Sequence, residues 1–146
     1  MGFKYELFGP GQDAILPSLL TQAAPSTAQY QGLLGSLVGA DMNVVTDQAI
    51  SINAQSYRIT KITVTNASVN MTNADGGIYP AAAKAGTAIV AAAQIYTALT
   101  AATIALDLTL NDPNTILSAA TIYFSLTGAQ GAPATADIYI YGDRIA

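Results

Sequence analysis

The chain has 146 residues, of which 51% are hydrophobic and only 10% are charged, and its formal net charge is −4. A soluble domain usually carries about 25% charged residues, so the shortage predicts that another molecule covers part of the surface. The basic residues form no cluster, and no apolar run approaches the ~20 residues of a membrane span, which argues against nucleic-acid and membrane partners.

Glycine and proline divide the first 43 residues into short apolar clusters. Their spacing leaves no room for a long helix, although residues 14–23 or 27–38 could each form a short one. We interpret residues 1–43 as an N-terminal arm that reaches a neighbouring molecule, or as an extension packed on its own domain. A disordered tail would contain fewer Leu and Phe residues. The predicted contact residues of this segment are Phe3, Tyr5, Leu7, Phe8, Leu16 and Leu20.

From residue 44 onward the sequence has patterns typical of β-strands. Residues 56–68 are rich in β-branched side chains, which favour strands. The apolar positions change phase between Ile59 and Ile62. This change predicts a β-bulge near Lys61 or a strand that is buried on both faces.

The second half of the chain continues the β pattern. Residues 87–99 mix alanines with β-branched residues, and we predict a strand there because of the surrounding β pattern. Residues 103–110 alternate in polarity and predict a strand with one buried face. Residues 120–143 predict two further strands joined by a turn. Their inward side chains are Ile122, Phe124, Leu126, Ile138 and Ile140.

The outward positions of these last two strands are polar or aromatic and include a single charge. They are Thr121, Tyr123, Ser125, Thr127, Asp137, Tyr139 and Tyr141. Alternation predicts that the three tyrosines share one face, and tyrosine is enriched at protein interfaces. We therefore predict a protein contact surface there. Sugar binding and plain cross-strand packing are the other interpretations, and the absence of Trp argues against sugar binding.

The fold class follows from these segments. About seven or eight short strands at regular spacing, with no long helix, predict an all-β protein with antiparallel sheets, a β-sandwich or jelly roll. We place this domain at residues 44–146, after the N-terminal arm.

The side-chain inventory argues against an enzyme. The chain has no His and no Cys, and Glu6 is its only glutamate. His-dependent triads, thiol chemistry and the commonest metal ligands are therefore missing, and the aspartates are scattered. We predict no catalytic residue, no metal site and no cofactor.

The order of several segments resembles that of a known class of proteins. Within residues 44–143 the segments are VTNAS, GGIY, IVAAAQIYTALT, YFSLTGAQG and ATADIYIYG. This order resembles small virion structural proteins of tailed bacteriophages, the cement or decoration proteins of the capsid. The resemblance implies a β-sandwich or jelly-roll subunit on the outer capsid surface that clamps neighbouring major capsid proteins, commonly as a dimer or trimer.

The expected partners are therefore the major capsid protein and further copies of the chain. The expected location is the virion surface, after synthesis in the host cytoplasm. The alternative function is a receptor- or glycan-binding module of a head fibre, tail fibre or spike.

Overall fold

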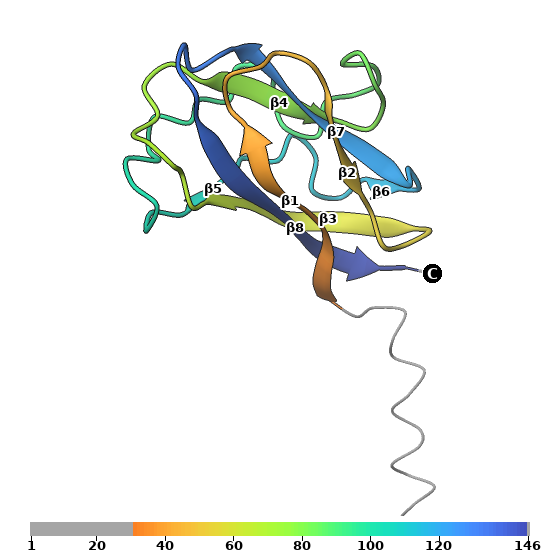
Figure 1. Cartoon of the computed structure of the whole chain (residues 1–146). Helices are drawn as coiled ribbons and strands as arrows, with labels where there is room; N and C mark the ends of the chain where they lie inside the picture. The colour runs from red at the N-terminus through yellow and green to blue at the C-terminus, as the bar shows by residue number, and fades with distance from the viewer. Residues whose placement is uncertain (1–30, 146) are drawn as a thin grey trace, which may run out of the picture.

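The computed structural model describes residues 31–145, and these form eight β-strands and no helix (Figure 1). The strands are β1 (Gln31–Asp41), β2 (Gln48–Ser51), β3 (Tyr57–Thr65), β4 (Asp75–Tyr79), β5 (Leu106–Asp107), β6 (Ile116–Leu117), β7 (Thr121–Gly128) and β8 (Thr135–Arg144).

The strands form two sheets in which every pairing is antiparallel. One sheet has the order β1-β8-β3-β5, with β6 also paired to β3, and the other has the order β2-β7-β4. This arrangement confirms the predicted all-β class with antiparallel sheets. Consecutive strands mostly lie in different sheets, so the chain crosses repeatedly from one sheet to the other (Figure 1).

Both sheets contribute to one hydrophobic core. Period-2 alternation puts every second side chain of a strand on the same face, and these inward side chains are fully buried. From the larger sheet come Leu34, Ile62, Val64, Ile138 and Ile140, and from the smaller sheet Ile50, Ile78, Ile122, Phe124 and Leu126. All the inward positions predicted for the last two strands are confirmed.

The larger sheet also contains the predicted irregularity in β3. Its pairing with β8 shifts register between Ile59 and Lys61, and Ile59, Ile62 and Val64 are all buried. A bulge adds one residue to one strand and so exchanges which parity faces the core. The bulge predicted near Lys61 is therefore confirmed.

The beginning of the described chain differs from the prediction. Residues 31–41 lie inside the predicted arm and partly inside the possible helix 27–38, yet they form the edge strand β1 and pair with β8. Pairing with the distant strand β8 satisfies backbone hydrogen bonds of this segment and buries Leu34 and Ala40. The boundary at residue 43 is therefore corrected, because residues 31–41 already belong to the larger sheet.

Two predicted strands between β4 and β7 are shorter or missing. Residues 87–99 form no strand and only isolated bridges at Val90 and Ile95. Val90, Tyr96 and Leu99 are buried while most alanines between them are exposed. Buried residues at this irregular spacing are typical of a connecting segment from which individual side chains pack into the core. The strand predicted at residues 87–99 is therefore wrong. Of residues 103–110, only Leu106–Asp107 is a strand.

The last two strands are not a hairpin. β7 lies between β2 and β4 in the smaller sheet, and β8 lies between β1 and β3 in the larger one. The turn at residues 129–134 therefore carries the chain from one sheet to the other. This crossing has a direct consequence for the predicted tyrosine surface.

Candidate interaction surface

The outward side of the larger sheet carries the tyrosines of β8. Antiparallel pairing aligns side chains in rows across the sheet. Tyr141 is paired with Leu33 of β1 and Lys61 of β3, and Tyr139 with Ser36 and Thr63. We define the tyrosine face as the outward positions Leu33, Ser36, Val38, Lys61, Thr63, Asp107, Tyr139 and Tyr141.

The tyrosine face exposes apolar as well as aromatic surface. Leu33 and Val38 of the edge strand are 45% and 69% exposed, and both tyrosines are partly exposed. Neither apolar residue was predicted as a contact, because no strand was predicted over residues 31–41. The alternation around Leu33, Leu34 and Leu37 is the signal that could have indicated a strand there.

The charges on the tyrosine face are paired with each other. The ammonium of Lys61 lies 3.4 Å from the carboxylate of Asp107, and the Thr63 hydroxyl donates to that carboxylate at 2.6 Å. The Thr63 hydrogen bond, and to a lesser degree Lys61, lower the pKa of Asp107. The face therefore keeps one positive and one negative charge at neutral pH and has no net charge.

Asp137 occupies an outward position of β8 but does not present its charge to solvent. The residue is only 8% exposed. Its carboxylate accepts the backbone N–H of Gly39 at 2.7 Å and the side-chain amide of Asn66 at 2.9 Å. The carboxylate expected to face solvent is therefore hydrogen-bonded within the fold. It links β8 to Gly39 of β1 and to Asn66, the residue that follows β3.

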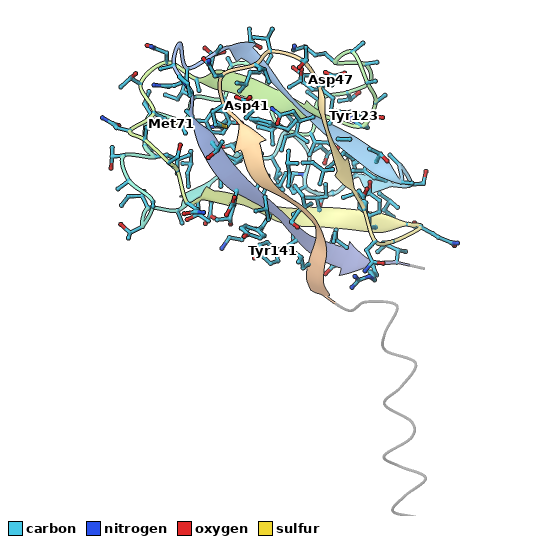
Figure 2. The ribbon with its side chains drawn as sticks, in the orientation of Figure 1. Asp41, Asp47, Met71, Tyr123 and Tyr141 are labelled. Carbon is cyan, nitrogen blue, oxygen red and sulfur yellow. The ribbon has the colours of Figure 1, made fainter. Side chains whose placement is uncertain are left out.

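The predicted grouping of three tyrosines is wrong. Tyr123 belongs to β7, so it lies on the outward side of the smaller sheet, whereas Tyr139 and Tyr141 lie on the outward side of the larger sheet. Figure 2 shows Tyr123 beside the upper, smaller sheet and Tyr141 below the larger one. The two sheets face each other with their inward sides, so the sets of tyrosines point in opposite directions.

Connecting segments cover much of the outward side of the smaller sheet. Ser125, predicted to be outward, is fully buried, and its hydroxyl donates to the carbonyl of Val45 at 3.4 Å. The Thr127 hydroxyl donates to the Ala92 carbonyl at 3.2 Å. Tyr79, which pairs with Tyr123, is 5% exposed.

A strained turn forms part of this cover. Ala83 and Lys84 have φ values of 60° and 59°, in the left-handed region that L-residues seldom adopt. The Asp47 carboxylate accepts the N–H of Ala83, and the Lys84 ammonium donates to the Leu126 carbonyl at 3.1 Å. These two bonds hold the turn against the smaller sheet.

The remaining predicted contact residues are Phe3, Tyr5, Leu7, Phe8, Leu16 and Leu20, and they lie outside the described residues. Within residues 31–145, no group of three or more potential metal ligands gathers, and no helix long and apolar enough to cross a membrane occurs. The chain matches no protein-family model, and searches of the curated proteins and of the solved structures found no significant match.

Proposed function

We propose that the chain is a structural protein of a virus particle, a cement protein that binds the outer surface of a tailed-phage head and clamps neighbouring major capsid proteins. Three features support the proposal: the shortage of charged residues, the order of segments that resembles cement proteins, and the open tyrosine face.

The tyrosine face is the observation that carries the proposal. It combines two tyrosines with exposed Leu33 and Val38 and has no net charge. Aromatic side chains offer large contact area at low entropic cost, and interface cores are depleted of charge. We propose that a capsid subunit or a second copy of the chain, in a dimer or trimer, covers this face.

We further propose that the two sheets form a jelly roll. Folding a hairpin of eight strands pairs β1 with β8, β2 with β7, β3 with β6 and β4 with β5, and rolling it up adds the pairs β3–β8 and β4–β7. All of these pairings except β4–β5 occur among the described strands, which supports the proposal. β5 departs from this pattern, because it pairs with β3 and not with β4.

A cement protein needs contact surface and no active site. A ligand that binds only the closed state of an assembly stabilises that state by mass action. Many copies bind one head, so modest affinity per contact suffices when one copy joins several subunits. A partly apolar face without net charge suits such a role better than a strongly charged surface does.

The test uses heads assembled from the major capsid protein whose gene neighbours that of the chain. The wild-type chain should co-sediment with these heads to a saturating, stoichiometric level. Tyr139→Ala combined with Tyr141→Ala should weaken binding by about 30-fold, as expected for loss of about 2 kcal/mol at a contact centre. The melting temperature of the free protein should change little by comparison.

Tyr123→Ala provides the matched control, because Tyr123 lies on the opposite outward side. This variant should bind heads as the wild type does. Equal loss in the control and the double variant, or no loss in either, would refute the proposed interface. Saturable binding to glycans without binding to heads would instead support the fibre or spike module.

A further inference from the structure

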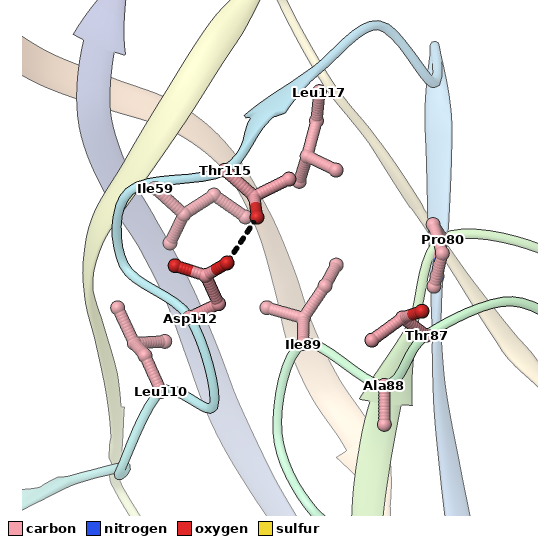
Figure 3. Close-up of a pocket in the computed structure, with 9 residues that line it drawn as sticks. All are labelled: Ile59, Pro80, Thr87, Ala88, Ile89, Leu110, Asp112, Thr115 and Leu117. Atoms are coloured by element: carbon pink, nitrogen blue, oxygen red, sulfur yellow. Dashed lines mark hydrogen bonds between the residues drawn. The ribbon is translucent and has the colours of Figure 1, made fainter.

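A cleft opens between the two sheets on the side away from β1. It has a volume of about 410 Å³, within the ~300–1,000 Å³ typical of binding pockets. Figure 3 shows that its walls come from β3, from β6 and from the connections on either side of β5. The lining is apolar except for two threonines and one acid, and it consists of Ile59, Pro80, Thr87, Ala88, Ile89, Leu110, Asp112, Thr115 and Leu117.

Asp112 is the single charged residue of the lining. The Thr115 hydroxyl donates to its carboxylate at 2.7 Å, and the backbone N–H of Asn114 donates at 3.0 Å. These bonds lower the pKa of Asp112, with the Thr115 bond as the larger cause. The carboxylate therefore stays ionised at neutral pH, beside Ile59 and Leu110 (Figure 3). An apolar occupant that carries a positive charge would complement this lining.

The register of the larger sheet places the start of β1 at the same end as the cleft. Gln31 pairs with Asp143, Asp143 with Arg58, and Arg58 with Ile116, the residue before Leu117 of the lining. Three strand spacings of about 4.8 Å separate Gln31 from Ile116, or about 14 Å. The chain that precedes Gln31 therefore joins the described domain at the same end as the cleft, on the opposite edge of the larger sheet.

The sequence before Gln31 contains a segment with the required chemistry. Residues 3–8 read FKYELF, in which the apolar residues Phe3, Tyr5 and Leu7 alternate with the basic Lys4 and the acidic Glu6. Lys4 is the single basic residue among the first 30. Residues 9–30 can span up to about 70 Å at about 3.3 Å per residue, so the covalent connection permits residues 3–8 to reach the cleft.

We propose that the cleft binds residues 3–8 of its own chain. Apolar side chains among Phe3, Tyr5 and Leu7 enter the cleft, and Lys4 lies against Asp112 at its rim. The contact removes aromatic surface from water in a chain that has few charges to keep it soluble. It does not depend on the proposed capsid function, because the free chain alone should form it.

Disulfide trapping tests the proposal in the full-length chain, which contains no cysteine of its own. Glu6→Cys leaves the apolar side chains of the segment intact, and Thr87→Cys places a thiol on the exposed rim of the cleft. With oxidised glutathione, this pair should form an intrachain disulfide at least ten times faster than the control pair Glu6→Cys with Thr103→Cys. Thr103 is also exposed but does not line the cleft.

Charge exchange within the same cysteine pair tests the proposed contact between Lys4 and Asp112. In the cysteine pair, Lys4→Glu should slow trapping, and adding Asp112→Lys should restore the rate. Equal rates for the cleft and control pairs would overturn the proposal. So would disulfides that link different chains, which would assign residues 3–8 to a neighbouring copy.

Discussion

The outward sides of the two sheets contrast with each other although their strands have similar sequence patterns. β7 presents Tyr123 and Ser125 outward, and β8 presents Tyr139 and Tyr141. On the smaller sheet, connecting segments reach over the strand and bury Ser125 completely. On the larger sheet the tyrosines stay partly exposed beside Leu33 and Val38. The comparison shows that an outward position is free for a partner only where no loop of the same chain lies over it.

The difference arises from where the connections go. Residues 44–47 lead into β2 and residues 80–94 follow β4, and both strands belong to the smaller sheet. Each segment forms hydrogen bonds on the outward side of that sheet. The larger sheet receives no such cover over Tyr139 and Tyr141 in the described residues. Its polar groups there pair locally, as Thr63 and Lys61 do with Asp107.

The largest loss of stability is expected at Gly77 of the smaller sheet, where the connecting segment at residues 90–91 packs against the strand. A Cβ atom on Gly77 would lie 2.3 Å from the carbonyl oxygen of Val90 and 2.9 Å from that of Ala91. Because both atoms are backbone, Gly77→Ala should displace the segment and lower the free energy of unfolding by about 2–3 kcal/mol. Urea unfolding measures this loss. Ser36→Ala on the open face should change stability by less than about 0.5 kcal/mol; similar losses in both variants would remove the contrast.

A smaller gain in stability is expected from a substitution in the strained turn at Ala83 and Lys84, which lies over the smaller sheet. Ala85 N–H donates to the Ala82 carbonyl at 3.2 Å and closes a turn in which both central residues have positive φ. Such turns favour Asn and Gly. Ala83→Gly should therefore raise the free energy of unfolding by about 0.5–1 kcal/mol, because glycine adopts this φ without steric cost.

Ala82→Gly is the matched control for this turn, because Ala82 is outside the left-handed region. It should destabilise the protein by about 0.4–1 kcal/mol through the greater entropy of the unfolded chain. Destabilisation by Ala83→Gly in chemical denaturation would show that the turn is not strained.

The smallest effects concern acid stability. The Ala83 N–H lowers the pKa of Asp47 on the covered side, and Thr63 and Lys61 lower that of Asp107 on the open face. A carboxyl whose folded pKa is lowered adds stability above its unfolded pKa, near 3.9, and loses it as pH falls through the folded value. Asp47→Asn and Asp107→Asn should each flatten the decline in melting temperature below about pH 4.

Salt separates the two sites in the same experiment. Lys61 and Asp107 are solvent-exposed, so 1 M NaCl should reduce the contribution of their Coulombic attraction. The hydrogen bond of Asp47 to the backbone N–H of Ala83 should respond less. A pH profile that is unchanged in both variants would contradict the assigned pKa shifts.

The sequence predicted the side chains of β7 and β8 that face the core, and it predicted the bulge near Lys61. These features are local, because parity along one strand and a change of phase within it can be read without knowing the neighbours. The strand β1 was missed because its glycines resemble a loop and its partner β8 is about a hundred residues away. Residues 87–99 were misassigned because Val90, Tyr96 and Leu99 are buried individually from an irregular segment.

The candidate surface was predicted in part. Alternation correctly placed Tyr139 and Tyr141 on one side of one strand, and it correctly placed Tyr123 on the side opposite to Ile122 and Phe124. It could not indicate that β7 and β8 belong to different sheets. The outward sides of the two sheets point in opposite directions. Because β7 pairs within one sheet and β8 within the other, Tyr123 is separated from Tyr139 and Tyr141.

The sequence by itself determined the class of fold, the inward residues of its regular strands and the scarcity of charge. The tertiary structure alone decided which strands share a sheet, which outward side the loops cover and where the cleft opens. The physical reason is that alternation is a property of a single strand, whereas pairing and cover depend on contacts between residues far apart in the chain.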